Sequence, residues 1–225
     1  MLEPTVSSLP SAAPVSTLPV IHAVTSDEIV LRADFIDVAC AVMAALGARG
    51  ALHLRAGRIS AARLQTLAGG LEAAQAVTNA WLVVNDRVDL ALGARARGAQ
   101  LTSRSLRVAD ARRAAPALAI GASVHSLDEA RAAASEGATW LVAGHVFATT
   151  THPGEEGRGL AFLREVARAV PIPVIAIGGV RPEHCRMLRE SGAYGLAVIR
   201  GIWDAPNAER AASDYLSAYD DAAGA

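Results

Sequence analysis

Short apolar runs recur along the chain from about residue 20 onward, and longer stretches of helical period separate them. Because both faces of each run are apolar and turn residues bound it, the runs are typical of buried parallel strands. The predicted strands cover residues 20–24, 51–54, 81–84, 99–101, 118–120, 140–143, 174–177 and 196–199. The stretches between them predict helices near residues 33–48, 60–76, 86–97, 106–115, 127–136, 160–170, 181–191 and 206–221.

Eight strands alternating with eight helices, with about one unit per 25 residues, match a (β/α)8 TIM barrel near the lower end of its size range. A doubly wound sheet also alternates strands and helices, but rarely through eight even repeats. Helix, glycine and next strand follow one another at Gly47, Gly98, Gly137 and Gly192. The sequence therefore predicts a single α/β domain, a TIM barrel over residues 19–225. Residues 1–18, rich in Pro, Ser and Ala, predict a disordered extension.

The amino-acid composition excludes several classes of function. All 21 basic residues are arginine, and 22 acidic residues give a formal net charge of −1. A nucleic-acid-binding protein usually has a basic surplus, so no nucleic-acid partner is expected. Schiff-base, P-loop and pyridoxal phosphate mechanisms need a lysine, and the sequence excludes them because it contains none.

The sequence shows no sign of export or of membrane insertion. The first twenty residues lack the basic and continuous apolar regions of a signal peptide. No apolar run approaches the about 18 residues that span a bilayer. The two cysteines, Cys40 and Cys185, are too few and too far apart for a disulfide scaffold or a zinc site. We therefore expect a cytoplasmic protein with free thiols and no membrane partner.

The carboxyl ends of the strands are where a TIM barrel holds its active site. Gly178 and Gly179 follow the seventh predicted strand, and Arg200 and Gly201 follow the eighth. Loops at these two places often present backbone N–H groups to a phosphate, and glycine lets the anion approach closely. A tight turn alone would also explain Gly178 and Gly179. Together with Arg200, however, the glycines favour a small substrate that carries a phosphate.

Other polar side chains also follow strands. His145 comes after the sixth strand, where it could take and return a proton near neutral pH. A buried structural histidine is the alternative. Arg55 ends the second strand and suits either an anionic substrate group or a surface ion pair. Asn85 and Asp86 follow the third strand, and His125 follows the fifth.

Six blocks of sequence carry a family resemblance. They are Gly144-His145-Val146-Phe147, Thr149-Thr150-Thr151, Glu156-Gly157-Arg158-Gly159, Pro173-Val174-Ile175-Ala176-Ile177-Gly178-Gly179, Ser123-Val124-His125-Ser126-Leu127 and Asn85-Asp86-Arg87-Val88-Asp89. Over about residues 19–205 the chain resembles the thiamine phosphate synthase superfamily, and most closely its TenI-type thiazole tautomerase branch. The resemblance implies a TIM barrel, a homodimer and a step in making the thiazole half of thiamin.

The superfamily has two main activities, and the sequence motifs of the synthases differ from those of the tautomerases. A synthase has Gln-x-Arg-x-Lys at the second strand, where this chain has His53-Leu54-Arg55-Ala56-Gly57 without the lysine. In the loop after the sixth strand, His145 and His152 stand where a synthase has proline and lysine. The loop after the fourth strand contains no acid, so Asp86 alone remains of the usual acid pair. One carboxylate is a poor magnesium site.

The tautomerase resemblance implies a dihydrothiazole carboxylate phosphate as substrate and His145 as the group that moves its proton. Such a reaction needs no metal and no other cofactor. The resemblance also implies the contacts of the substrate. Its phosphate would be bound by Gly178, Gly179 and Gly201, with Arg200 nearby. Its carboxylate would pair with Arg55, and its ring would contact Asn85 and His125. Arg200 departs from the serine that the family has there. Two alternatives stay open: a thiamine phosphate synthase, and a barrel that binds a thiazole phosphate without catalysis.

Overall fold

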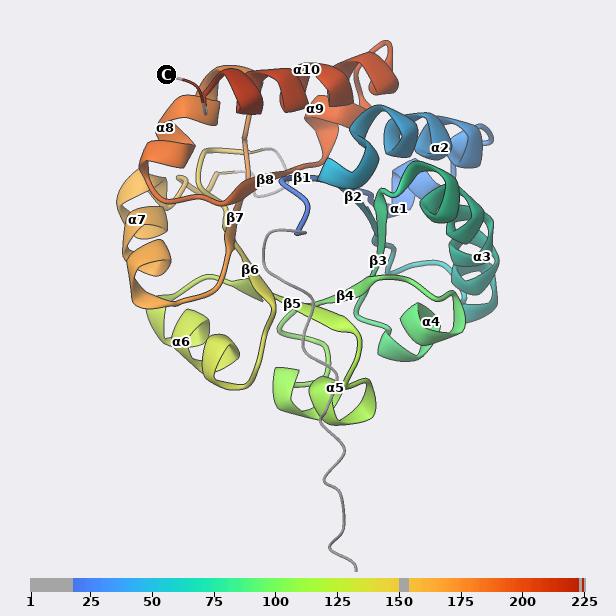
Figure 1. Cartoon of the computed structure of the whole chain (residues 1–225), viewed down its shortest axis with the longest axis horizontal. Helices are drawn as coiled ribbons and strands as arrows, with labels where there is room; N and C mark the ends of the chain where they lie inside the picture. Colours follow the sequence, from blue (N-terminus) through green and yellow to red (C-terminus); the bar gives the residue numbers. More distant parts are fainter. Residues whose placement is uncertain (1–17, 150–153, 223, 225) are drawn as a thin grey trace, which may run out of the picture.

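Eight parallel strands close into a barrel in the order of the sequence, and helices surround it (Figure 1). The computed structural model describes residues 18–149, 154–222 and 224. Parallel pairing of Ile21 with Leu196 joins the first strand to the last. The predicted TIM barrel is therefore confirmed. The strands are β1 (Ile21–Val24), β2 (Gly50–Leu54), β3 (Trp81–Asn85), β4 (Gly98–Leu101), β5 (Ala119–Val124), β6 (Trp140–Gly144), β7 (Val174–Ile177) and β8 (Gly195–Val198).

All eight predicted helices have a counterpart in the structure. The α-helices are α1 (Asp27–Val30), α2 (Phe35–Leu46), α3 (Ala61–Thr78), α4 (Val88–Gly93), α5 (Val108–Ala114), α6 (Leu127–Ser135), α7 (Gly159–Ala169), α8 (Cys185–Glu190), α9 (Arg200–Trp203) and α10 (Ala208–Asp221), and 3-10 turns cover Gly47–Arg49 and Pro182–His184. Two α-helices of the structure, α1 and α9, were not predicted. With four residues each, they are too short to show a helical period.

The helix predicted over residues 86–97 is only half as long in the structure. Asp86 and Arg95 have φ angles of 63° and 46°, so neither is helical. Ala94 and Ala96 are nevertheless buried, at 1% and 7% exposure. Their burial explains why the apolar pattern runs on after the helix has ended.

β5 is longer than predicted because Gly121 is part of the strand. A Cβ atom on Gly121 would lie 2.2 Å from Cε2 of Trp140, which fills the inside of the barrel. The Trp140 indole N–H donates to Oε1 of Gln100 at 2.9 Å. Glycine therefore makes room for Trp140 here and does not mark a turn, so the strand continues to Val124.

The amino-terminal boundary differs by one residue from the predicted one. Leu18, assigned to the extension, is 6% exposed and packs with Trp140 inside the barrel. Its carbonyl accepts a hydrogen bond from the Tyr194 hydroxyl at 2.9 Å. The rest of the predicted extension, residues 1–17, lies outside the described residues, as does His152.

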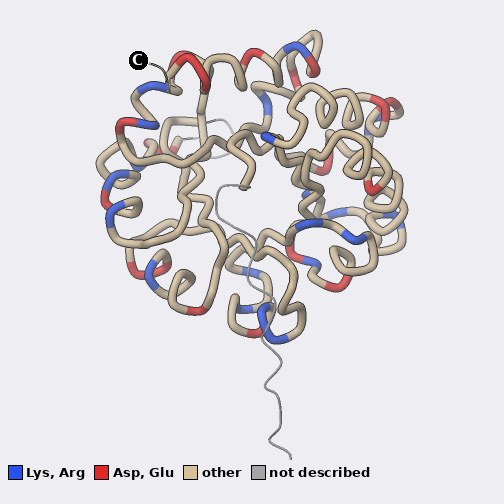
Figure 2. The backbone as a smooth tube through the Cα atoms, in the orientation of Figure 1, with Lys and Arg blue, Asp and Glu red and all other residues tan. Residues whose placement is uncertain are grey.

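Charged residues of both signs are distributed around the outer ring in the view of Figure 2.

Cys40 and Cys185 are free thiols, as expected. Among the described residues, no helix combines the length and the apolar character that a membrane crossing requires.

Candidate functional site

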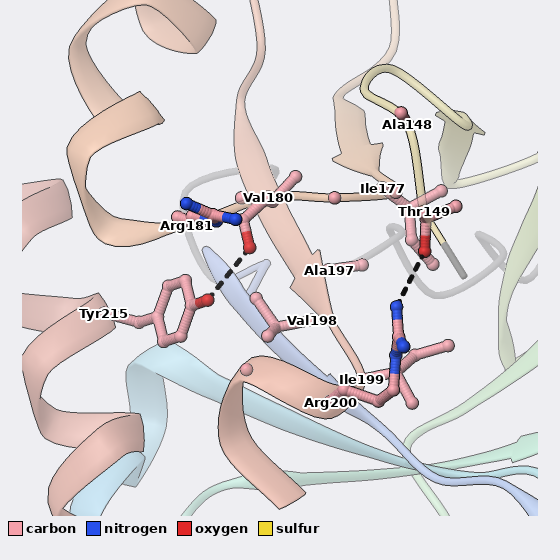
Figure 3. Close-up of a pocket in the computed structure, with 13 residues that line it drawn as sticks. Ala148, Thr149, Ile177, Val180, Arg181, Ala197, Val198, Ile199, Arg200 and Tyr215 are labelled. Atoms are coloured by element: carbon pink, nitrogen blue, oxygen red, sulfur yellow. Dashed lines mark hydrogen bonds between the residues drawn. The ribbon is translucent and has the colours of Figure 1, made fainter. Parts of the chain in front are cut away.

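A cavity of about 280 Å³ lies at the carboxyl ends of β7 and β8 (Figure 3). The loops after β6, β7 and β8 form most of its wall, and α10 completes it. Gly178, Gly179, Arg200 and Gly201 all line this cavity. The structure therefore brings together the four residues that the sequence assigned to a phosphate.

Gly178 and Gly179 have φ angles of 100° and 64°, which side-chain-bearing residues rarely adopt. Space also requires glycine here. A Cβ on Gly178 would lie 2.3 Å from Cβ of His145, and one on Gly179 would lie 2.5 Å from the Ala148 carbonyl oxygen. Within the described chain, the two glycine N–H groups donate to no backbone carbonyl. They are therefore available to an anion in the cavity.

Arg200 and Gly201 open α9, and N–H groups in the first turn of a helix have no partner within that helix. The Arg200 guanidinium reaches across the cavity and donates to Oγ1 of Thr149 at 3.2 Å (Figure 3). Arg181, which the sequence did not single out, also lines the cavity. The Arg200 guanidinium thus gives the cavity positive charge, as a phosphate site needs, whereas the Arg181 guanidinium is exposed and pairs with Glu183 at 3.7 Å.

His145 directly follows β6, after a cis Gly144–His145 peptide bond. Its side chain packs beside the Gly178 turn, and the residue is 8% exposed. Nε2 lies 3.2 Å from the carbonyl oxygen of Glu156. Because a carbonyl oxygen only accepts, Nε2 donates, and Nδ1 is the basic nitrogen of the neutral ring.

Asn85 is the last residue of β3 and is 7% exposed. Its buried Oδ1 makes no hydrogen bond of ordinary geometry among the described residues, but the Asn85 side chain lies close enough to His53 to raise the pKa of that ring, against the larger effect of burial. A buried amide oxygen without a partner is costly in a folded protein. Asn85 does not line the cavity, and its amide lies beside the buried His53.

Two buried histidines lie deeper in the barrel. His22 Nε2 lies 2.9 Å from the Pro19 carbonyl oxygen, so this nitrogen donates. His22 Nδ1 lies 2.8 Å from His53 Nε2, which must be the donor of this second bond when both rings are neutral. Burial lowers the pKa of His22 to about 4, and burial followed by the neighbouring His22 lowers the pKa of His53. Both rings are therefore neutral near pH 7.

Arg55 and His125 lie away from the cavity. Thr25 fixes the Arg55 backbone, since its hydroxyl accepts from the Arg55 N–H at 2.8 Å. The Arg55 side chain is partly exposed at the carboxyl end of β2. The His125 side chain is 46% exposed, and its Nδ1 lies 3.3 Å from a carboxylate oxygen of Glu129.

The hydrogen bonds at the start of α6 explain this position of His125. The Ser126 hydroxyl accepts from the Glu129 N–H at 3.2 Å, as expected for a helix cap. The Glu129 carboxylate, however, accepts from the N–H of His125 at 2.6 Å instead of from that of Ser126. Glu129 thus holds His125 at the start of α6, and the structure does not bring its ring to the cavity.

The residues around Asp86 do not fit a magnesium site. Oδ1 of Asp86 accepts from both the N–H and the hydroxyl of Thr102, at 3.1 and 2.7 Å, and also from the Ser105 hydroxyl. In the part of the chain that the structure describes, no three acidic, histidine or cysteine side chains cluster where they could hold a metal. Asp86 instead ties the loop after β3 to the loop after β4.

Sequence reasoning missed one residue of the cavity that comes from a distant helix. Tyr215 of α10 is 3% exposed, and its hydroxyl donates to the Val180 carbonyl at 2.9 Å. On an amphipathic helix, an inward tyrosine has the same pattern as any core residue. No signal in the sequence could have assigned it to the site.

Comparisons with known proteins agree with this architecture. Residues 21–202 match the protein family described as thiamine monophosphate synthase. A thiamine-phosphate synthase of Pyrococcus furiosus is 40% identical over 136 residues, which are 60% of this chain and 66% of that protein. The match to the enzyme of Pyrococcus horikoshii spans 62% of its length, so both matches cover slightly less than two thirds of these relatives.

Longer matches give the same family. A thiamine-phosphate synthase of Methanoculleus marisnigri is 35% identical over 181 residues, which are 78% of this chain and 86% of that protein. The solved structure of thiamine phosphate pyrophosphorylase from Pyrococcus furiosus has a TM-score of 0.79 at 29% identity, and the match covers 92% of this chain and 98% of that one. Orotidine 5'-phosphate decarboxylase from Pyrococcus horikoshii, at 15% identity and a TM-score of 0.63, shares the fold alone. The chain belongs to the thiamine monophosphate synthase family.

Proposed function

We propose that this chain is a thiazole tautomerase, an isomerase that aromatises a dihydrothiazole carboxylate phosphate in thiamin biosynthesis. One observation carries the proposal: Cα and Cβ of His145 lie directly against Gly178, which lines a cavity suited to an anion, although His145 itself is not part of the lining. A phosphate in the cavity would hold the attached ring near an acid–base group. Such positioning accounts for much of the rate of a simple proton transfer.

The proposed step moves one proton and leaves the composition of the substrate unchanged. Nδ1 of His145 takes the proton from ring C2, and the electron pair of that C–H bond shifts into the ring. The exocyclic C=C double bond becomes a single bond as its electron pair moves to the exocyclic carbon, and His145 returns the proton to that carbon to form the new C–H bond. The hydrogen bond from Nε2 to the Glu156 carbonyl oxygen orients the His145 ring.

The remaining contacts follow from the same binding mode. The N–H groups of Gly178, Gly179 and Gly201 hold the phosphate, with Arg200 at the cavity wall. Arg55 as the carboxylate contact and Asn85 as a ring contact lie outside the cavity lining and stay predictions. His125 as a ring contact and the homodimer stay predictions from the family resemblance.

Thiamine phosphate synthase is the second candidate, and the names of the relatives favour it. A synthase would transfer a pyrimidine group from its diphosphate to the thiazole phosphate. This chain has no lysine for the departing diphosphate, and Oδ1 of Asp86 is engaged by Thr102 and Ser105. The donor set therefore supports the tautomerase better.

Two assays on the purified protein separate the candidates. We expect the dihydrothiazole tautomer to be converted to the aromatic thiazole, and no diphosphate to be released from the synthase substrates. Diphosphate release would establish the synthase instead. Binding of the thiazole phosphate with neither reaction would establish a non-catalytic binding barrel.

Replacement of His145 tests the assigned catalytic group. We expect His145→Gln to lower kcat by at least about 100-fold, the usual contribution of general acid–base catalysis, while phosphate binding is retained. His184→Gln is the matched control, because this histidine lies in the 3-10 turn Pro182–His184 and does not line the cavity. Turnover by His145→Gln close to that of the wild type would refute the assignment.

A further inference from the structure

The Tyr215 hydroxyl contacts two of the three loops that line the anion cavity, those after β7 and β8 (Figure 3). It donates to the Val180 carbonyl at 2.9 Å, which belongs to the loop after β7. It also lies directly against Gly201, after β8, because a Cβ atom there would be 2.2 Å from the hydroxyl oxygen. One side chain from α10 thus bridges two loops that are separate in the sequence.

The hydroxyl is poorly suited to bind the anion itself. The hydroxyl hydrogen is donated to the Val180 carbonyl, so toward the cavity the hydroxyl oxygen can only accept a hydrogen bond, whereas an anion needs a donor. Burial raises the pKa of Tyr215 to about 12, so the group stays protonated and neutral. Its effect on the cavity must therefore come through the position of the loops.

We propose that Tyr215 is a positioning residue of the anion site, whose hydroxyl sets the spacing between Val180 and Gly201 so that both loops bind one phosphate. The same geometry explains why residue 201 is glycine, since the hydroxyl occupies the space of a Cβ atom. The proposal rests on the proposed function insofar as it takes the cavity to be the phosphate site.

Tyr215→Phe, with Tyr219→Phe as its control, tests the proposal. Tyr219 is also on α10, is 5% exposed, and donates its hydroxyl to the Tyr194 carbonyl at 2.5 Å, but it does not line the cavity. Each variant loses one hydrogen bond from a tyrosine hydroxyl to a backbone carbonyl, buried for Tyr215 and partly buried for Tyr219. Titration with inorganic phosphate and steady-state kinetics on the tautomer substrate are the two measurements.

We expect Tyr215→Phe to weaken phosphate binding roughly 3- to 10-fold, in line with the loss of one hydrogen bond, and to raise KM equally with kcat unchanged. Tyr219→Phe should lower the melting temperature to a similar extent but leave the affinity for phosphate unchanged. Equal losses of phosphate affinity in the two variants, or no loss in Tyr215→Phe, would refute the positioning role.

A second variant uses the steric contact. We expect Gly201→Ala to weaken phosphate binding in the wild-type background. In the Tyr215→Phe background, where the hydroxyl is absent, the same substitution should weaken phosphate binding by a smaller factor. Without it, the nearest side-chain atoms, Cζ of residue 215 and Cγ1 of Val198, lie at 3.1 Å and can shift slightly. Additive losses would show that the two residues act independently, contrary to the proposal.

These measurements also separate this proposal from the proposed function. If the wild type binds inorganic phosphate but does not convert the tautomer, the tautomerase assignment fails and the variants still decide the role of Tyr215. If the wild type does not bind phosphate at all, the cavity is no phosphate site and the positioning role is refuted.

Discussion

Gly178 shows what a single residue contributes to the site. Its positive φ turns the chain sharply after β7, and its missing side chain lets His145 pack against the turn. The glycine pair and His145 were singled out from the sequence because both follow predicted strands. Tyr215 and Arg181 were not, because their role depends on which loops they contact. Residue type and position along a strand are visible in a sequence, whereas contact across the barrel is not.

Gly178→Ala is expected to damage both the fold and the site. A left-handed φ costs a side-chain-bearing residue on the order of 1–3 kcal/mol, and the new methyl group would also push His145 away. Gly154→Ala is the control, because Gly154 has a φ of 80° but no atom within 4 Å of the added Cβ. Both variants should melt at a lower temperature than the wild type. Only Gly178→Ala should lose phosphate binding and turnover, and a full retention of both would contradict the close packing.

The strands β1 and β2 each place a polar side chain, His22 and His53, in the core of the barrel. His22 and His53 alternate with apolar residues, so the sequence pattern of buried strands hides them. Parallel register places Val24 opposite His53 and His22 opposite Ala51, and the two rings meet inside the barrel. The sequence predicted both strands, but the hydrogen bond between the rings follows from the register.

The two histidines predict a loss of stability in mild acid. The folded protein holds His22 at a pKa of about 4, below its value of 6.5 in the unfolded chain. Between these pH values the unfolded state binds more protons, so stability is full above pH 6.5 and falls as the pH drops toward 4. For His22 alone the loss approaches about 3 kcal/mol, and His53 adds to it in the same direction.

Urea unfolding at a series of pH values between 7.5 and 4.5 measures this effect, with wild type and His22→Gln compared side by side. We expect the wild-type free energy of unfolding to decrease below about pH 6.5 and the variant to show a shallower decrease. Parallel curves for the two proteins would show that His22 does not titrate in this way.

At the scale of the whole molecule, closure of the barrel decides where the domain begins. β1 pairs with both β2 and β8, and Leu18 packs with Trp140 inside the barrel. The sequence placed the boundary one residue later because Leu18 stands in a segment rich in Pro and Ser. Its burial depends on β8 and Tyr194, which are about 175 residues away in the chain.

Truncation of Leu18 should therefore destabilise the barrel. We expect Leu18→Ala to lower the free energy of unfolding by about 2–4 kcal/mol, as for other buried leucines. Leu31→Ala is the control, because Leu31 is 66% exposed and its truncation should cost less than about 0.5 kcal/mol. Chemical denaturation of both variants gives the comparison. Equal stabilities would mean that Leu18 does not pack in the barrel in solution.

Periodicity and turn residues are local properties, and they were sufficient for the eight strands, the order of the barrel and the end of the barrel that carries the site. The same local signals identified the glycine turns and His145. Which side chains share one cavity depends on strand register and on helices that return from far along the chain. For that reason only tertiary contacts placed Tyr215 in the site and bonded Asp86 to Thr102 and Ser105, whereas His125 is held by a local contact with Glu129, four residues further along the chain.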